Sequence, residues 1–151
     1  MKKKILVPIV LGIFALAILG VYGYATTEAV GIKFISGTEY QQGEVGQVII
    51  RTLNGFGMPI SANSCNITIA YPNGTIWINN QAMTQSGATA GTWRYQFTTP
   101  FTAYGVYEEY VVCKIPTARG VVTRGAGSSF HVSQALTTIN DTASAQVVII
   151  S

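Results

Sequence analysis

The chain has 151 residues and a mass of 16.1 kDa, which suits one ordinary domain. Hydrophobic residues make up 48% of it and charged residues only 10%, against about 25% charged in an average soluble domain, which excludes a disordered chain. From Thr26 onward six cations balance six anions, so the pI of about 9.0 reflects three N-terminal lysines and gives no reason to expect nucleic acid as a partner.

Residues 1–25 have the pattern of an export signal. Lys2 to Lys4 form a positive segment, Ile5 to Val21 is an uncharged apolar run, and Gly23 and Ala25 place small residues at −3 and −1 of a cleavage site. The run is at the lower edge of the ~17–25 residues that span a bilayer as a helix. We therefore expect either a cleaved signal peptide or an N-terminal hydrophobic helix that stays as a membrane anchor. In both cases the remaining chain is extracellular or at the cell surface.

Two other interpretations of this segment are weaker. A pilin-type leader usually carries a small residue just before its cleavage site, whereas here Lys4 runs directly into Ile5. A buried N-terminal helix of a soluble protein would need a polar face, which the run from Ile5 to Val21 lacks.

The body of the chain reads as β-strands throughout. Cys65, Ile67, Ile69 and Tyr71 alternate with polar or small residues, which is the period of a half-buried strand, and the Pro72–Gly74 turn returns it as a hairpin over 63–78. Pro100 and Pro116 are expected to end two later strands, and the glycines at 125 and 127 to mark a bulge. We expect seven strands, over 33–37, 48–53, 65–71, 75–78, 93–97, 104–115 and 120–132.

The two cysteines, Cys65 and Cys113, both lie in the exported part. An even count in an oxidising compartment predicts a disulfide, with two free buried thiols as the alternative. By strand count they lie on the third and sixth strands, which would be neighbours in one sheet. Their pairing would close a loop of about 49 residues.

Residues 134–151 form a tail in which Leu136, Ile139, Ala143, Val147 and Ile150 make a heptad-like stripe. We expect a short helical tail, the start of a coiled-coil stalk, that projects and pairs with a second copy in a homo-oligomer. The alternative is a covering strand over 147–150, since these four residues are all β-branched.

Several short motifs resemble the paired strands of filamin-like and macroglobulin-like Ig-fold domains. The motifs are Gly91–Pro100, Gly105–Val112, Ile69–Thr75 and Gly43–Ile50, and the resemblance covers roughly residues 31–133. It implies an all-β, Ig-like antiparallel β-sandwich in an exported prokaryotic, bacterial or archaeal, surface protein. Members of such families are generally structural or binding modules without catalytic residues. The antibody-type pattern fits less well, because Val111 stands two residues before Cys113 where a tyrosine is expected.

Three Asn-x-Ser/Thr sequons make Asn66, Asn73 and Asn140 candidates for glycosylation on export. Asn66 has the opposite strand parity to Cys65 and should face solvent, and Asn73 lies in a turn. Chance sequons that are never modified are the alternative.

Groups for catalysis are scarce, and we expect no enzyme, cofactor or metal site. Glu108 and Glu109 are adjacent in a strand, so they point to opposite faces and cannot act as a pair. The only histidine, His131, has no zinc-spaced partner and would need Asp141 for a hydrolase triad. Gly55–Gly57 lies between strands and reads as a plain turn.

Eight aromatic residues are candidates either for the core or for an exposed carbohydrate-binding row, which the sequence leaves open. They are Tyr71, Trp77, Trp93, Tyr95, Phe97, Tyr104, Tyr107 and Tyr110. The sequence therefore predicts an exported, surface-attached Ig-like module with a structural or protein- or glycan-interaction role. The alternatives are a subunit of an extracellular filament and, third, a small secreted hydrolase.

Overall fold

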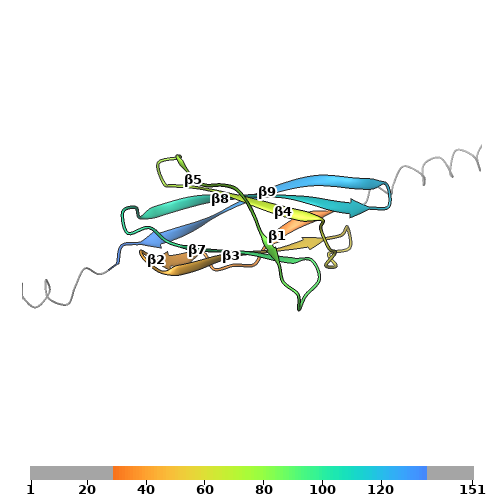
Figure 1. Ribbon diagram of the computed structural model, residues 1–151, viewed down its shortest axis with the longest axis horizontal. Helices are drawn as coiled ribbons and strands as arrows, with labels where there is room; N and C mark the ends of the chain where they lie inside the picture. The colour runs from red at the N-terminus through yellow and green to blue at the C-terminus, as the bar shows by residue number, and fades with distance from the viewer. Residues whose placement is uncertain (1–28, 136–151) are drawn as a thin grey trace, which may run out of the picture.

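Nine strands form two sheets packed face to face in the computed structural model, which describes residues 29–135 (Figure 1). The four-stranded sheet has the order β1 (Gly31–Phe34), β3 (Val45–Leu53), β7 (Thr92–Thr98), β6 (Thr84–Gln85). The five-stranded sheet has the order β2 (Glu39–Gln41), β9 (Gly120–Ser133), β8 (Gly105–Thr117), β4 (Ser64–Ala70), β5 (Ile76–Ala82).

This strand order is that of an Ig-like sandwich. The four-stranded sheet corresponds to strands A, B, E and D, and the other sheet contains the C, F and G strands as β4, β8 and β9, extended by β5. All pairs are antiparallel except β2 with β9. The predicted all-β, Ig-like sandwich is therefore confirmed. The described chain begins and ends at opposite ends of the sandwich (Figure 1).

All seven predicted strands are present, with shifted boundaries. The first covers 31–34 rather than 33–37, and two very short strands, β2 and β6, were not expected. The 63–78 hairpin is confirmed as β4 and β5, joined by a turn in which Gly74 has φ 82°. The predicted N-terminal helix (1–25) and most of the tail (134–151) lie outside the described residues. Within residues 29–135, no helix is long and apolar enough to cross a membrane.

Two expectations about the β8–β9 hairpin were wrong. Strand β8 continues through Pro116, which pairs with Val121. Proline is tolerated there because β4 pairs with β8 only as far as Lys114, so beyond it one side of β8 is an open edge. The glycines at 125 and 127 mark no bulge, since β8 and β9 pair without a break from 105–117 to 120–132.

The core between the sheets is rich in aromatic residues. Residues of β3, β4 and β8 alternate between buried and partly or fully exposed positions along each strand, as half-buried strands must. The rings of Phe97 and Phe130 stack at 5.2 Å between centroids, as do those of Tyr107 and Phe130. Tyr40, Tyr71 and Trp77 pack edge-on or tilted against this group. Fixed ring geometry of this kind adds stability beyond the area it buries.

Tyr107 closes the corner that leads into β8. Its hydroxyl donates a hydrogen bond to the carbonyl oxygen of Ala103, four residues upstream, at 3.2 Å. This is the geometry of the tyrosine corner of Ig domains, in which a cysteine follows two residues later. Here Glu109 occupies that position, and it points into the core. Because Tyr107 lies six residues before Cys113 and not two, the position of the cysteine does not predict this tyrosine.

Candidate functional site

The outer face of the five-stranded sheet carries an exposed tyrosine that lies across glycines. Tyr110 in β8 is 51% exposed, and Gly127 is its register partner in β9. A Cβ atom at Gly125 would collide with the Tyr110 hydroxyl, and one at Gly127 would lie 3.7 Å from the ring carbon Cδ2. The ring therefore lies over the β9 backbone, where a side chain on Gly125 would displace it.

A hollow of about 600 Å³ opens beside this ring. It combines apolar surface from Ala70 and Ile76 with hydroxyl groups from Thr68 and Ser129 and the carboxylate of Glu108. Clefts of this size that join an aromatic surface with a few polar groups are typical binding sites for small ligands or for parts of larger ones. An aromatic face with flanking acceptors and hydroxyls suits a sugar ring, which has an apolar face and a polar rim.

Glu108 and Glu109 point to opposite faces, as predicted, and the structure shows which one is buried. Glu108 is exposed on the outer face, whereas Glu109 is only 5% exposed on the core side. Burial raises the Glu109 pKa to about 7, while a hydrogen bond from Ser128 lowers it. Its Oε2 atom has no hydrogen-bond partner among residues 29–135. The Glu109 side chain therefore faces away from the outer hollow, and its burial affects the stability of the fold.

Two of the three serines near His131 have hydrogen-bond partners other than the imidazole. The imidazole is exposed on β9, in register with Val106 of β8 and Glu39 of β2. Of the nearby serines, Ser128 hydrogen-bonds Glu109 on the opposite face and Ser133 Oγ donates to the carbonyl oxygen of Tyr40 at 3.2 Å. Asp141 lies outside the described residues. Within residues 29–135, no three His, Cys, Asp or Glu side chains form a group suited to a metal ion.

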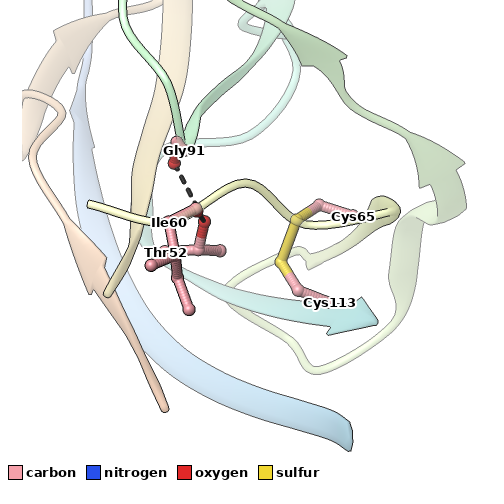
Figure 2. Close-up of a disulfide and its surroundings, with 5 residues drawn as sticks. All are labelled: Thr52, Ile60, Cys65, Gly91 and Cys113. Carbon is pink, nitrogen blue, oxygen red and sulfur yellow. Dashed lines mark hydrogen bonds between the residues drawn. A yellow bond between two sulfur atoms is a disulfide. The ribbon is translucent and has the colours of Figure 1, made fainter. Parts of the chain in front are cut away.

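The cysteines form the predicted disulfide between adjacent strands of one sheet (Figure 2). Cys65 in β4 and Cys113 in β8 are direct register partners, with their Cα atoms 4.1 Å apart, and both are fully buried. Antibody domains instead bridge their two sheets. The close Cα distance is that of a non-hydrogen-bonded antiparallel pair, in which side chains approach most closely.

The buried Thr52 lies in the same part of the core as the disulfide (Figure 2). Its hydroxyl is within hydrogen-bonding distance of the carbonyl oxygens of Ile60 and Gly91. Its backbone N–H also donates to the Gly91 carbonyl at 2.8 Å. This residue therefore has a structural role, because it ties two loops to β3.

Two of the three sequons fall in the described part of the chain, and their surroundings differ. Asn66 is half-buried in β4, and its amide Nδ2 donates to Asn80 Oδ1 at 3.0 Å. Asn73 is exposed in the turn between β4 and β5. Asn140 lies outside the described residues.

The eight aromatic candidates divide between the core and the surface. Trp93, Phe97 and Tyr107 are buried, and Tyr71, Trp77 and Tyr95 are partly buried. Tyr104 and Tyr110 are exposed, but they line two separate hollows. The core accounts for most of the set, as expected for alternating strands. Gly125 and Gly127, which the sequence predicts as a bulge, are instead the sequence signal for the position of the Tyr110 ring across β9.

The Gly55–Gly57 segment is the plain turn that the sequence predicted. Asn54 Oδ1 accepts hydrogen bonds from the backbone N–H groups of Phe56 and Met58, each at 3.0 Å. Gly57 has φ 76°, which favours glycine. The turn leaves Phe56 92% exposed.

No family model and no curated protein matches this chain. Among solved structures, it is similar to a DUF4785 family protein from Legionella pneumophila subsp. pneumophila str. Philadelphia 1, with a TM-score of 0.54 and 11% identity. The match covers 73% of this chain but only 30% of that protein's length. The Lin-41 filamin domain aligns with a TM-score of 0.47 and 13% identity, over 72% of this chain and 95% of the domain. At such identities the first likeness supports the β-sandwich fold alone, and the second is too loose to carry an argument.

Proposed function

We propose that this protein is an exported, surface-attached Ig-like module of a prokaryotic surface protein, and that it binds a carbohydrate through the outer face of its five-stranded sheet. The observation that carries the binding role is the hollow beside Tyr110, where an exposed ring lies next to Glu108, Thr68 and Ser129. The filamin-like and macroglobulin-like motifs of the sequence agree with a binding or structural module rather than an enzyme.

Two features support export. Residues 1–25 have the charge and hydropathy pattern of a signal peptide or anchor. The buried disulfide is typical of proteins that fold in an oxidising compartment. If the N-terminal segment is not cleaved, it also anchors the protein in the membrane.

Export predicts that the 31–133 body is accessible from outside the cell. In intact cells that express the full chain, added protease should remove this body or an epitope placed in the Phe56 turn, while a cytoplasmic marker stays whole. Cys65 and Cys113 should resist alkylation until the protein is reduced. Protection of the body from protease, or alkylation without reduction, would contradict export.

A Tyr110→Ala variant is expected to bind its carbohydrate about fivefold more weakly, because stacking of this kind contributes about 1 kcal/mol. The measurement is calorimetry with a panel of soluble cell-surface polysaccharides. Gly125→Val should weaken binding as well, since its side chain displaces the ring. Phe56→Ala is the matched control, because Phe56 is an exposed ring that does not line this hollow. Equal binding by Tyr110→Ala and wild type, or binding of a protein partner alone, would overturn the carbohydrate assignment.

A filament subunit is the second candidate, and the free edge of β9 favours it. The backbone N–H of His131 donates to the carbonyl oxygen of Thr38 at 2.7 Å, on the side of β9 that faces away from β8. The other odd-numbered residues of β9 direct their backbone N–H and carbonyl groups to this same side, because backbone groups alternate along a strand. Strand β2 covers only residues 131–133, and within the described chain no strand pairs with 121–129 on that side. The other edges, in β1, β2, β5 and β6, are short or bulged. Light scattering of the chain with and without residues 134–151 discriminates this role from that of a lone module.

A further inference from the structure

We propose that Asn73 is the N-glycosylation site of the described domain, and that the first sugar of its glycan occupies the hollow next to it. The proposal rests on the proposed export, because glycan transfer takes place on the exported side of a membrane. It selects one of the two described sequons on structural grounds.

The turn that holds Asn73 presents it at a projecting corner. Tyr71 and Thr75 close the turn through a backbone hydrogen bond of 2.8 Å, and Gly74 donates to the Tyr71 carbonyl at 2.8 Å. Gly74 takes φ 82°, a conformation that glycine adopts without strain. Asn73 thus lies exposed in the turn at the tip of the β4–β5 hairpin.

The hydrogen bonds of Asn73 leave its reactive atom available. Its Oδ1 accepts from the Thr75 backbone N–H at 3.0 Å and from the Thr75 hydroxyl at 2.7 Å. The side-chain carbonyl is therefore held by the sequon's own threonine. Within residues 29–135, the amide Nδ2 has no hydrogen-bond partner, so modification of this nitrogen costs the fold no interaction.

Asn66 is in the opposite situation. It lies within β4, is half-buried, and uses Nδ2 to contact Asn80 Oδ1 at 3.0 Å and the Asn80 carbonyl at 3.5 Å. Asn80 has φ 47° at an irregular position of the edge strand β5, so this contact holds β5 against β4. A glycan on Asn66 would break it.

The hollow next to Asn73 suits a single sugar. It has a volume of about 360 Å³, within the range of small-ligand sites, and is lined by Asn73 itself with Tyr71, Pro72, Thr75 and Tyr104, and by Ala103. The Tyr104 ring is 61% exposed. An exposed aromatic ring beside the attachment point can cover the apolar face of the first sugar.

The modification is a group transfer from a lipid-diphosphate-linked oligosaccharide, catalysed by a membrane-bound oligosaccharyltransferase. A bond forms between Asn73 Nδ2 and the anomeric carbon of the sugar, and the bond from that carbon to the phosphate oxygen breaks. The lipid diphosphate leaves with the electron pair, and the amide proton passes to a base on the transferase. No redox change occurs.

The test is secretion of the full chain from a eukaryotic cell, with intact mass measured before and after enzymatic removal of N-glycans. All variants carry Asn140→Gln, because Asn140 lies outside the described residues. Each variant is made in two versions, one with its own N-terminal segment and one with a known signal peptide in place of residues 1–25. We expect one glycan, lost in Asn73→Gln and Thr75→Ala and retained in Thr75→Ser and Asn66→Gln.

Failure of export and failure of this site give different results. Arrival at the cell surface or in the medium only with the known signal peptide would count against export by residues 1–25. The glycosylation site is then determined from the version with the known signal peptide. An unmodified secreted chain, or a glycan that persists in Asn73→Gln and is lost in Asn66→Gln, would overturn the assignment. For the sugar position, the glycan should raise the melting temperature relative to Asn73→Gln. That rise should vanish in a Tyr104→Ala background and persist in Tyr104→Phe, whereas the same rise in Tyr104→Ala would overturn the stacking.

Discussion

A Cys65→Ala, Cys113→Ala double variant is expected to lose about 4 kcal/mol of its free energy of unfolding. The disulfide joins residues 48 apart, and in the chain-entropy model a closed loop of this length restricts the unfolded chain by about that amount. Both cysteines are fully buried in the core, so the loss of packing around the sulfur atoms adds to the effect. Guanidinium unfolding followed by tryptophan fluorescence measures it.

Two comparisons isolate the contribution of the disulfide bond to the free energy of unfolding. Wild-type protein unfolded in the presence of a strong reductant should lose a similar free energy, while the double variant should be insensitive to reductant. A destabilisation of less than about 1 kcal/mol in both would contradict the prediction, because it would mean that β4 and β8 hold this register equally well without the bond.

A Glu109→Gln variant is expected to be more stable than wild type by about 3 kcal/mol at pH 8 and about equally stable at pH 4. Burial raises the pKa of this carboxyl from 4.5 to about 7 in the folded protein, with Ser128 as the hydrogen-bond partner. Folding therefore favours the protonated form. The contribution of this protonated carboxyl to the free energy of unfolding of the wild type is fully present below pH 4.5. It declines as the pH rises to about 7. Each unit of pKa difference corresponds to 1.36 kcal/mol.

The matched control for this prediction is Glu108→Gln, which removes the same charge from the neighbouring residue on the exposed face. It should leave the pH dependence of the melting temperature unchanged. Tyr40 is the nearby titratable group that interacts with Glu109, and it stays neutral through this pH range because burial raises its pKa from 10.0. A wild-type stability that does not decline between pH 5 and pH 8 would contradict the burial of an ionisable Glu109.

Local residue patterns were sufficient to predict most strands and the disulfide. The alternation from Cys65 to Tyr71 and from Trp93 to Phe97 predicts strands because side chains of a strand point to opposite faces in turn. Proline and glycine at 72–74 predict the hairpin because they set backbone angles directly. Counting strands then placed Cys65 and Cys113 on neighbouring strands, which the register confirms. The strands and the hairpin depend on residues close in sequence, whereas the disulfide joins residues 48 apart and was predicted from the even cysteine count and the strand order.

The candidate sites depended on contacts between distant segments, which only the tertiary structure decides. The two- and three-residue strands β6 and β2 are too short to leave a pattern, and they exist because β7 and β9 offer them an edge to pair with. Adjacent carboxyls at 108 and 109 must face opposite ways, but which one enters the core follows from the register of β8 between β4 and β9. The same register brings Tyr110 over the backbone of Gly125 and Gly127, because a ring can lie flat on a sheet only where the next strand has no side chain in its way.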